Sequence, residues 1–224
     1  MVGVIFNRQM SLEDFQRALG PKDMERVGLF IDGNNMFYAQ HQMGWFFDPK
    51  KLLEIIEGRN RERYIMLANW YAGIKMPGDS ADFYNFLSNV GYRVRTKLLK
   101  EFINYDEETG EVTVTHKANL DIELCSDVLA LIDQYQIIVL VSGDGDFTTM
   151  VEYALSKGKR VIVMSTQPSI SIDLINAAST YVDLRSVRDL IIKDRDKERL
   201  ERERLEREKE RDRVTETVKK VITR

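Results

Sequence analysis

Two stretches of the sequence end an apolar run on an aspartate. Asp32 follows the run VGLFI, and Asp144 and Asp146 follow the run IIVLVS. A third stretch, LDIELCSD, places Asp121 at the start of a helical pattern. Carboxylates that converge from separate segments repel one another, and a hard divalent cation with oxygen ligands relieves that repulsion. These acids predict a Mg²⁺ or Mn²⁺ site, able to activate water and to neutralise charge on a phosphodiester.

The elements that would position these acids alternate along the chain from Val27 onward. The expected strands are Val27–Asp32, Tyr64–Tyr71, Tyr92–Leu99, Ile137–Ser142, Arg160–Ser165 and Tyr181–Leu184. The expected helices are Met36–Gln42, Pro49–Glu57, Asp79–Val90, Leu120–Gln134, Phe147–Lys157 and Ile170–Ala177. Apolar strands between helices predict a three-layer α/β/α, Rossmann-like domain with a mainly parallel sheet. Ligands of such sheets bind at the carboxyl ends of the strands, where we expect the acids to meet.

Other polar residues are expected to surround the acids. Asn34 and Asn35 either cap a helix that starts after Gly33 or take part in the chemistry. Asp127 lies six residues beyond Asp121, on another face of the same helix, so it is expected to support the site rather than to bind the metal. Ser142, at the end of a strand, is placed with Asn34 and Asp127 in this supporting group.

Three regions interrupt or flank the alternation. The stretch KEFINYDEETGEVTVTHK predicts an inserted β-hairpin with Glu-Thr-Gly at its turn, which either grips a substrate or decorates the sheet edge. Residues 1–26 form a predicted helical extension with Ser11 and Asp14 as a capping box, and residues 27–192 form the domain. Residues 193–224 form a charged helical tail, either a solvated spacer or an arm for a protein partner or a second copy.

Composition limits the class of protein. The chain of 224 residues has a net charge of −3, 43% apolar residues and a single cysteine, Cys125. One cysteine excludes an internal disulfide and any multi-cysteine metal site. No apolar run reaches the length of a membrane span and no signal-peptide pattern is present, so the expected location is the cytoplasm, away from membranes. An acidic chain must bind a polyanion through a local basic patch or through metal ions.

One basic patch stands out in the stretch YRVRTKLLK. Arg93, Arg95 and Lys97 recur at period two, so they share one face of a strand. They either line a groove for the phosphate backbone of RNA or protect a solvated edge strand. Trp45 and Trp70 have the chemistry to stack on bases, but their apolar contexts favour the core.

The stretches FIDGNNM, KANLDIELCSD and LVSGDGDF, in this order, resemble the NYN branch of the PIN-like nucleases, most closely its bacterial LabA-like members. The resemblance covers Val27 to Leu184. It implies a PIN-like fold and metal-dependent endoribonuclease activity on single-stranded or structured RNA.

By motif position, the resemblance makes Asp32, Asp121 and Asp144 metal-binding catalytic acids, with Asp146 as a fourth. Asn35 would orient Asp32 or the substrate. Lys117 would lie near the phosphate.

Two other interpretations remain open. The spacing Asp144-x-Asp146-x-Thr148 after an apolar strand also fits haloacid-dehalogenase phosphatases, although it explains neither Asp32 nor Asp121. Alternatively, the protein is a regulatory module that keeps the fold and acts by binding partners without essential catalysis.

Overall fold

A seven-stranded sheet forms the centre of the protein. The computed structural model describes residues 3–5, 9–18, 25–58, 63–105 and 112–222. The sheet has the order β1-β9-β8-β7-β2-β3-β4, and every neighbouring pair is parallel. Its strands are β1 (Gly3–Ile5), β2 (Glu25–Asp32), β3 (Arg63–Ile74), β4 (Arg93–Leu98), β7 (Ile137–Val141), β8 (Arg160–Ser165) and β9 (Thr180–Asp183). The predicted parallel α/β fold is confirmed.

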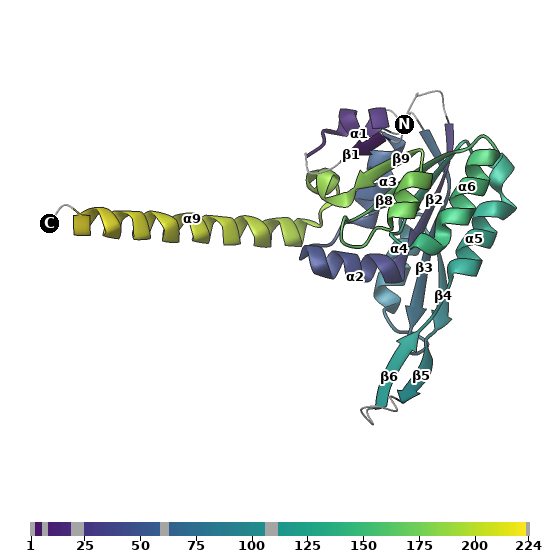
Figure 1. Cartoon of the computed structure of the whole chain (residues 1–224), viewed down its shortest axis with the longest axis horizontal. Coiled ribbons are helices and arrows are strands. Elements are labelled where there is room, and N and C mark those ends of the chain that lie inside the picture. The colour runs from purple at the N-terminus through teal and green to yellow at the C-terminus, as the bar shows by residue number, and fades with distance from the viewer. Residues whose placement is uncertain (1–2, 6–8, 19–24, 59–62, 106–111, 223–224) are drawn as a thin grey trace.

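Helices cover both faces of the sheet (Figure 1). One face carries α1 (Leu12–Ala18), α2 (Gly33–Met43), α3 (Pro49–Glu57), α4 (Ala81–Asn89) and α8 (Arg188–Ile191). The other carries α5 (Asp121–Ala130), α6 (Thr148–Ser156) and α7 (Ile172–Ala177). Short 3₁₀ turns occupy Ile132–Gln134 (η1), Gly145–Phe147 (η2) and Leu184–Val187 (η3). In β2, Leu29 and Ile31 pack under the first face and Phe30 under the second, which is why the strand is apolar at successive positions.

Helix α2 begins at Gly33, directly after β2, rather than at Met36 as the sequence pattern predicted. The side chain of Asp32 caps it by accepting the N–H of Asn35 at 3.0 Å. A Cβ atom at position 33 would lie 2.4 Å from Nε1 of Trp70 and 2.6 Å from the carbonyl oxygen of Tyr71. Only glycine permits α2 to start this close to β3.

The N-terminal segment contains a strand that the sequence pattern did not reveal. Strand β1 extends the sheet beside β9, and its three residues are too few to show a period-two pattern. The predicted capping box is present, because the N–H of Asp14 donates to Oγ of Ser11 at 3.1 Å. Phe15 of α1 is fully buried in the core. The division of the chain at residues 26 and 192 stays a prediction.

The predicted hairpin is an antiparallel pair, β5 (Lys100–Tyr105) and β6 (Val112–Lys117), and its Glu-Thr-Gly turn lies outside the described residues. Only Leu99 separates β4 from β5. Figure 1 shows the hairpin continuing beyond the carboxyl ends of β3 and β4. It therefore projects from the end of the sheet formed by the carboxyl ends of the strands, where the acids were expected.

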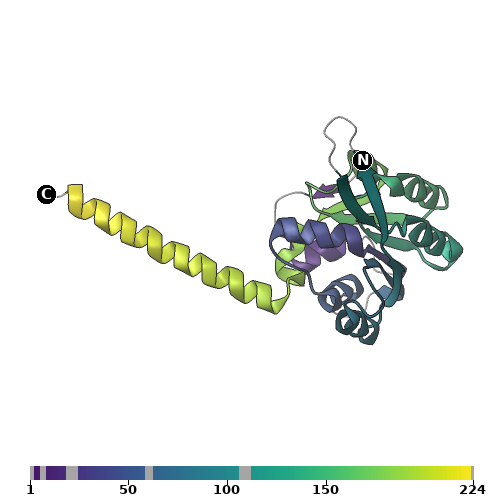
Figure 2. The ribbon, with the colours of Figure 1, turned by 90° about the horizontal axis from the view of Figure 1, so that it is seen from below.

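The charged tail is one long helix, α9 (Asp194–Ile222), which extends away from the domain (Figure 2). Its first turns are attached to the domain, since Oδ2 of Asp196 accepts the N–H of Phe46 at 2.8 Å and Leu200 packs against the core. Farther out, Arg204 pairs with Glu208 at 3.6 Å, four residues along the helix. No helix in the described part of the chain combines the length and the apolar character that crossing a membrane requires.

Candidate functional site

The sheet topology brings the two acidic strand ends together. From β2 the chain proceeds to β3 and β4 on one side of the sheet and then returns to β7 on the other side, so the strand order reverses between β2 and β7. Ile31 is the register partner of Val141, which places Asp32 beside Ser142. A point of reversed strand order is where ligands bind in open parallel sheets.

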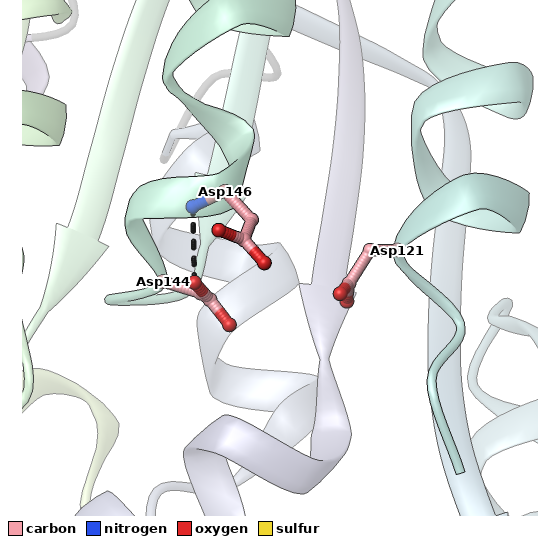
Figure 3. A group of neighbouring side chains, drawn as sticks. All are labelled: Asp121, Asp144 and Asp146. Carbon is pink, nitrogen blue, oxygen red and sulfur yellow. Dashed lines mark hydrogen bonds between the residues drawn. The ribbon is translucent and has the colours of Figure 1, made fainter.

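Three acids meet at this point. Among the described residues, Asp121, Asp144 and Asp146 each offer a carboxylate oxygen, and these oxygens all lie within 4.8 Å of one another (Figure 3). Asp121 is the first residue of α5, whereas the other two lie in and beside the η2 turn that follows β7. Oδ1 of Asp144 accepts the N–H of Asp146 at 3.0 Å, which fixes their relative position. We call these residues the acid cluster.

The electrostatics of the acid cluster suit a cation. Burial raises the pKa of Asp121, and the charges of Asp144 and Asp146 raise it further, against a lowering hydrogen bond with Asn119. Asp121 and Asp144 are half-buried and Asp146 is exposed, so the cluster opens to solvent. All of its donors are hard carboxylate oxygens, the ligand type that Mg²⁺ and Mn²⁺ prefer. The residues present therefore fit a divalent metal ion.

Asp32 lies next to the acid cluster but is not one of its three members. Its Oδ1 accepts the N–H of Asn35 and its Oδ2 accepts the hydroxyl of Ser142, each at 3.0 Å. The Ser142 hydroxyl oxygen in turn accepts the N–H of Asp144 at 3.2 Å. Burial raises the pKa of Asp32 to about 6, and the charges of Asp121 and Asp144 add to the rise. Asp32 is thus coupled to the cluster both by charge and through Ser142.

The two asparagines that follow Asp32 tie neighbouring segments to α2. Oδ1 of Asn35 accepts the N–H of Gly143, in the loop that carries Asp144, at 3.0 Å. Oδ1 of Asn34 accepts the N–H of Gly73 at 2.8 Å, and its Nδ2 donates to the carbonyl of Ala118 at 3.2 Å. The pair therefore connects the start of α2 to β3, to the segment before α5 and to the loop after β7.

Comparison with known proteins identifies the domain. The family model described as the NYN domain matches residues 26–185. This chain belongs to the NYN domain family. NYN domains are part of the PIN-like nuclease superfamily, and the matched region contains all four acids.

Two relatives extend the comparison. The low amplitude and bright protein LabA of Synechococcus elongatus is 45% identical over 168 residues, which cover 75% of this chain and 88% of that protein. A crystal structure of a Vibrio parahaemolyticus protein of unknown function has a TM-score of 0.60 and 22% identity, over 77% of this chain and 99% of that one. At this identity, the second likeness shows the fold alone.

Membership of the NYN family leaves the phosphatase interpretation without support. That interpretation rested on Asp144, Asp146 and Thr148, and it assigned no role to Asp121. The structure places Asp121 in the acid cluster. The NYN model matches residues 26–185, a range that contains all three acids.

Within this NYN domain, Asp127 fastens α5 to the sheet. Its Oδ2 accepts the hydroxyl of Tyr71 at 2.8 Å and Nδ2 of Asn69 at 3.2 Å. Its Oδ1 pairs with the guanidinium of Arg95 at 2.9 Å. Sequence reasoning did not single out Tyr71 or Asn69; the available signal was an asparagine within an otherwise apolar stretch, and the structure shows that this amide is fully buried.

Two residues of the predicted basic row form ion pairs with α5. Besides the contact of Arg95 with Asp127, the ammonium of Lys97 pairs with Glu123 at 2.7 Å and donates to the carbonyl of Asn119 at 3.1 Å. Two cations of the row thus connect α5 to β4, and a role for them in RNA binding stays a prediction.

The remaining cations expected to contact RNA lie at element ends. Arg93 begins β4 and is exposed. Lys117 ends β6, paired across the hairpin with Lys100, and its side chain lies outside the described residues. A role for either in RNA binding stays a prediction.

Proposed function

We propose that the protein is a metal-dependent endoribonuclease whose metal site consists of Asp121, Asp144 and Asp146. The observation that carries this proposal is the convergence of the three carboxylates within 4.8 Å at the reversal of strand order. Membership of a family in the PIN-like nuclease superfamily supports RNA as the substrate. The identity of the substrate and a cytoplasmic location remain predictions from the sequence.

The acid cluster would hold Mg²⁺ or Mn²⁺. Such an ion, when bound, lowers the pKa of a coordinated water and offsets negative charge on the phosphodiester. The chain positions the three acids that would bind this ion. Helix α5 delivers Asp121 from one side, and the turn after β7 delivers Asp144 and Asp146 from the other. Because Asp146 is exposed, the phosphate reaches the cluster from the solvent side.

In this proposal Asp32 acts from beneath the cluster. Its negative charge adds to the attraction for a cation, and its hydrogen bond holds the Ser142 hydroxyl that accepts the N–H of Asp144. Asn35 restrains the same loop through Gly143. These residues hold Asp144 in position so that little reorganisation is needed when the metal and the RNA bind.

The test is an RNA cleavage assay with purified protein, using single-stranded and structured RNAs in Mg²⁺, in Mn²⁺ and in chelator. Cleavage should require a divalent metal and should be lost in Asp121→Asn. The matched control is Asp133→Asn, since Asp133 is an exposed aspartate in the η1 turn before β7, at the other end of that strand. Cleavage that persists in chelator, or that survives Asp121→Asn, would contradict the proposal.

The alternative, a regulatory module that binds partners, is favoured by α9, which projects from the domain as an isolated helix (Figure 1). It predicts that cellular function survives the double change Asp121→Asn and Asp144→Asn but not removal of residues 201–224. The nuclease proposal predicts the reverse for the double variant. Complementation in cells distinguishes the two.

A further inference from the structure

The most exposed large hydrophobic side chains include residues near the starts of three helices that begin close to the acid cluster. Within the described part of the chain, the three highest exposed fractions belong to Ile122 (77%), Ile172 (73%) and Tyr38 (69%), and the Phe37 side chain is 52% exposed. All four lie in the first two turns of α5, α7 and α2. We call them the apolar rim. Phe37 and Tyr38 are in contact, with ring centroids 5.6 Å apart, so at least this part of the rim is a continuous exposed apolar surface of the kind that marks a binding site.

Each part of the apolar rim is fastened to the acids. In α5, Ile122 directly follows Asp121. In α7, the rim residue follows Ser171, whose N–H donates to the carbonyl of Gly143 at 2.9 Å. In α2, the two aromatic residues follow Asn35, which accepts the N–H of the same glycine. Three helices that each carry an exposed apolar residue therefore begin beside an acid of the cluster or beside the loop that carries Asp144.

The aromatic part of the rim continues along α2 and into the segment after it as a row of rings. The ring centroids of Tyr38 and Phe37 are 5.6 Å apart, those of Phe37 and His41 are 4.2 Å apart, and those of His41 and Phe46 are 5.0 Å apart. The row ends at a cation, because the ammonium of Lys193 lies 5.6 Å from the Phe46 ring. Aromatic rings beside a cation have the chemistry that binds single-stranded nucleic acid, because rings stack on bases and cations attract the phosphate backbone.

The mixture of apolar and acidic residues argues against a protein partner as the occupant. Protein interfaces have apolar centres from which charged residues are depleted. Here the charged centre lies between the apolar residues, with Asp121 adjacent to Ile122. RNA has the complementary arrangement, since its charged phosphate is flanked by apolar base faces. Bases in a duplex have both faces stacked, so only unpaired bases offer them.

We infer that the apolar rim binds the faces of unpaired RNA bases on either side of the phosphate that lies at the acid cluster. This inference rests on the proposed function, because the acids must hold a cation before a phosphate can approach. Phe37 and Tyr38 would provide stacking surfaces, and the two isoleucines would contact base faces on the opposite side. The tryptophans considered from sequence are excluded from this role, because Trp45 and Trp70 are buried.

Binding of a short RNA tests the inference without requiring cleavage. The probe is a fluorescent single-stranded 12-nucleotide RNA, measured by anisotropy with the full wild-type chain as the parent and with Ca²⁺, another hard cation with oxygen ligands, in place of Mg²⁺. Adding Tyr38→Ala and Phe37→Ala should weaken binding roughly 5- to 150-fold for each base that loses its stacking partner. Tyr38→Phe should bind like the parent, because the ring is retained. The matched control is Tyr64→Ala, which removes an exposed ring at the amino end of β3.

An RNA with abasic sites at its central nucleotides sharpens the test. The abasic RNA should bind the parent about as weakly as the intact RNA binds the double alanine variant. The abasic RNA and the double variant together should lose no more affinity than either change alone, since each change removes the same contact. Equal affinity of the parent and the rim variants for intact RNA would overturn the inference, as would losses that add in full.

Failure of the inference and failure of the proposed function give different results. If no RNA is cleaved in any metal but the rim variants still lose binding, the rim is an RNA surface and the nuclease proposal is wrong. If Asp121→Asn abolishes cleavage while the rim variants bind and cleave like wild type, the nuclease proposal holds and the rim inference is wrong.

Discussion

Asp32 and Asp144 end adjacent parallel strands, yet they have different surroundings. Each accepts a backbone N–H two or three residues along the chain, so each caps the element that follows it. The second oxygen of Asp32 accepts a hydrogen bond from Ser142, whereas the carboxylate of Asp144 joins the acid cluster. The difference arises after the strands, because α2 starts at once behind Asp32 while a 3₁₀ turn behind Asp144 brings Asp146 alongside. One strand-end aspartate therefore holds neighbouring segments in place, while the other is itself a member of the acid cluster.

The largest expected effect is on RNA cleavage and concerns Asp144. Asp144→Asn should reduce RNA cleavage by roughly a hundredfold or more, because it removes a charge from the proposed metal site. It should also raise the Mn²⁺ concentration needed for half-maximal activity. Both quantities come from initial rates across a metal titration, with Asp133→Asn as the control. Unchanged rates at saturating RNA would contradict the role of Asp144.

The next largest effect is on the stability of the folded protein and concerns Asp32. Since burial raises the pKa of Asp32 to about 6, keeping its carboxylate charged in the folded protein is costly. Asp32→Asn should therefore stabilise the metal-free protein at pH 7.5, by on the order of 2–3 kcal/mol. Asparagine also serves as a helix cap, so α2 keeps its start. Thermal unfolding in chelator measures the change.

The sign of the pH dependence follows from the same shift. Between pH 4 and 6 the unfolded chain releases the Asp32 proton while the folded protein retains it, so wild-type stability falls as the pH rises through this range. The advantage of Asp32→Asn should be absent near pH 4 and complete above pH 6. An advantage that is independent of pH would show that the charge of Asp32 is not its cause.

A smaller effect concerns the loop that carries Asp144. Asn35→Ala leaves the N–H of Gly143 without its side-chain partner and should destabilise the protein by about 1–3 kcal/mol. Cleavage should fall as well, because the loop is less restrained. Asn85→Ala, at an exposed position on α4, is the matched control for the loss of an asparagine. Chemical denaturation and cleavage rates provide the two measurements.

The smallest expected effect distinguishes two roles of Lys97, which either holds α5 in place or contacts RNA. Lys97→Met removes an exposed ion pair with Glu123 and should cost less than about 1 kcal/mol of stability. If Lys97 supports α5, the metal requirement should rise slightly while the salt dependence of RNA binding stays constant. A shallower salt dependence would instead show that Lys97 contacts phosphate.

The fold and the convergence of acids were predictable because they depend on local patterns. Apolar strands between helices predict a parallel sheet, and a shared sheet edge places Asp144 near Asp121. The environment of Asp32 was not predictable, since it depends on hydrogen bonds from Asn35 and Ser142 that form only in the folded chain. The same holds for β1, whose pairing with β9 is a contact between distant segments.

The basic row shows a second limit of sequence reasoning. Period two correctly placed Arg95 and Lys97 on one face of a strand, but it does not tell which element covers that face. In the structure α5 packs beside it and supplies Asp127 and Glu123 as partners. The exposure of aromatic residues was unpredictable for the same reason. Phe37 and Tyr38 are exposed because another face of α2 packs against the sheet, and the sequence does not show which face this is.

The length of helix α9 converts a small rotation at its attachment into a large displacement at its far end. Its first turns are joined to Phe46 and Gly44, just after the end of α2, and the other end of α2 is capped by Asp32. With 29 residues, α9 is about 43 Å long. A rotation of 5° at its attachment therefore moves its far end by about 4 Å. A label near the C-terminus would register small tilts of α2 as displacements large enough to measure.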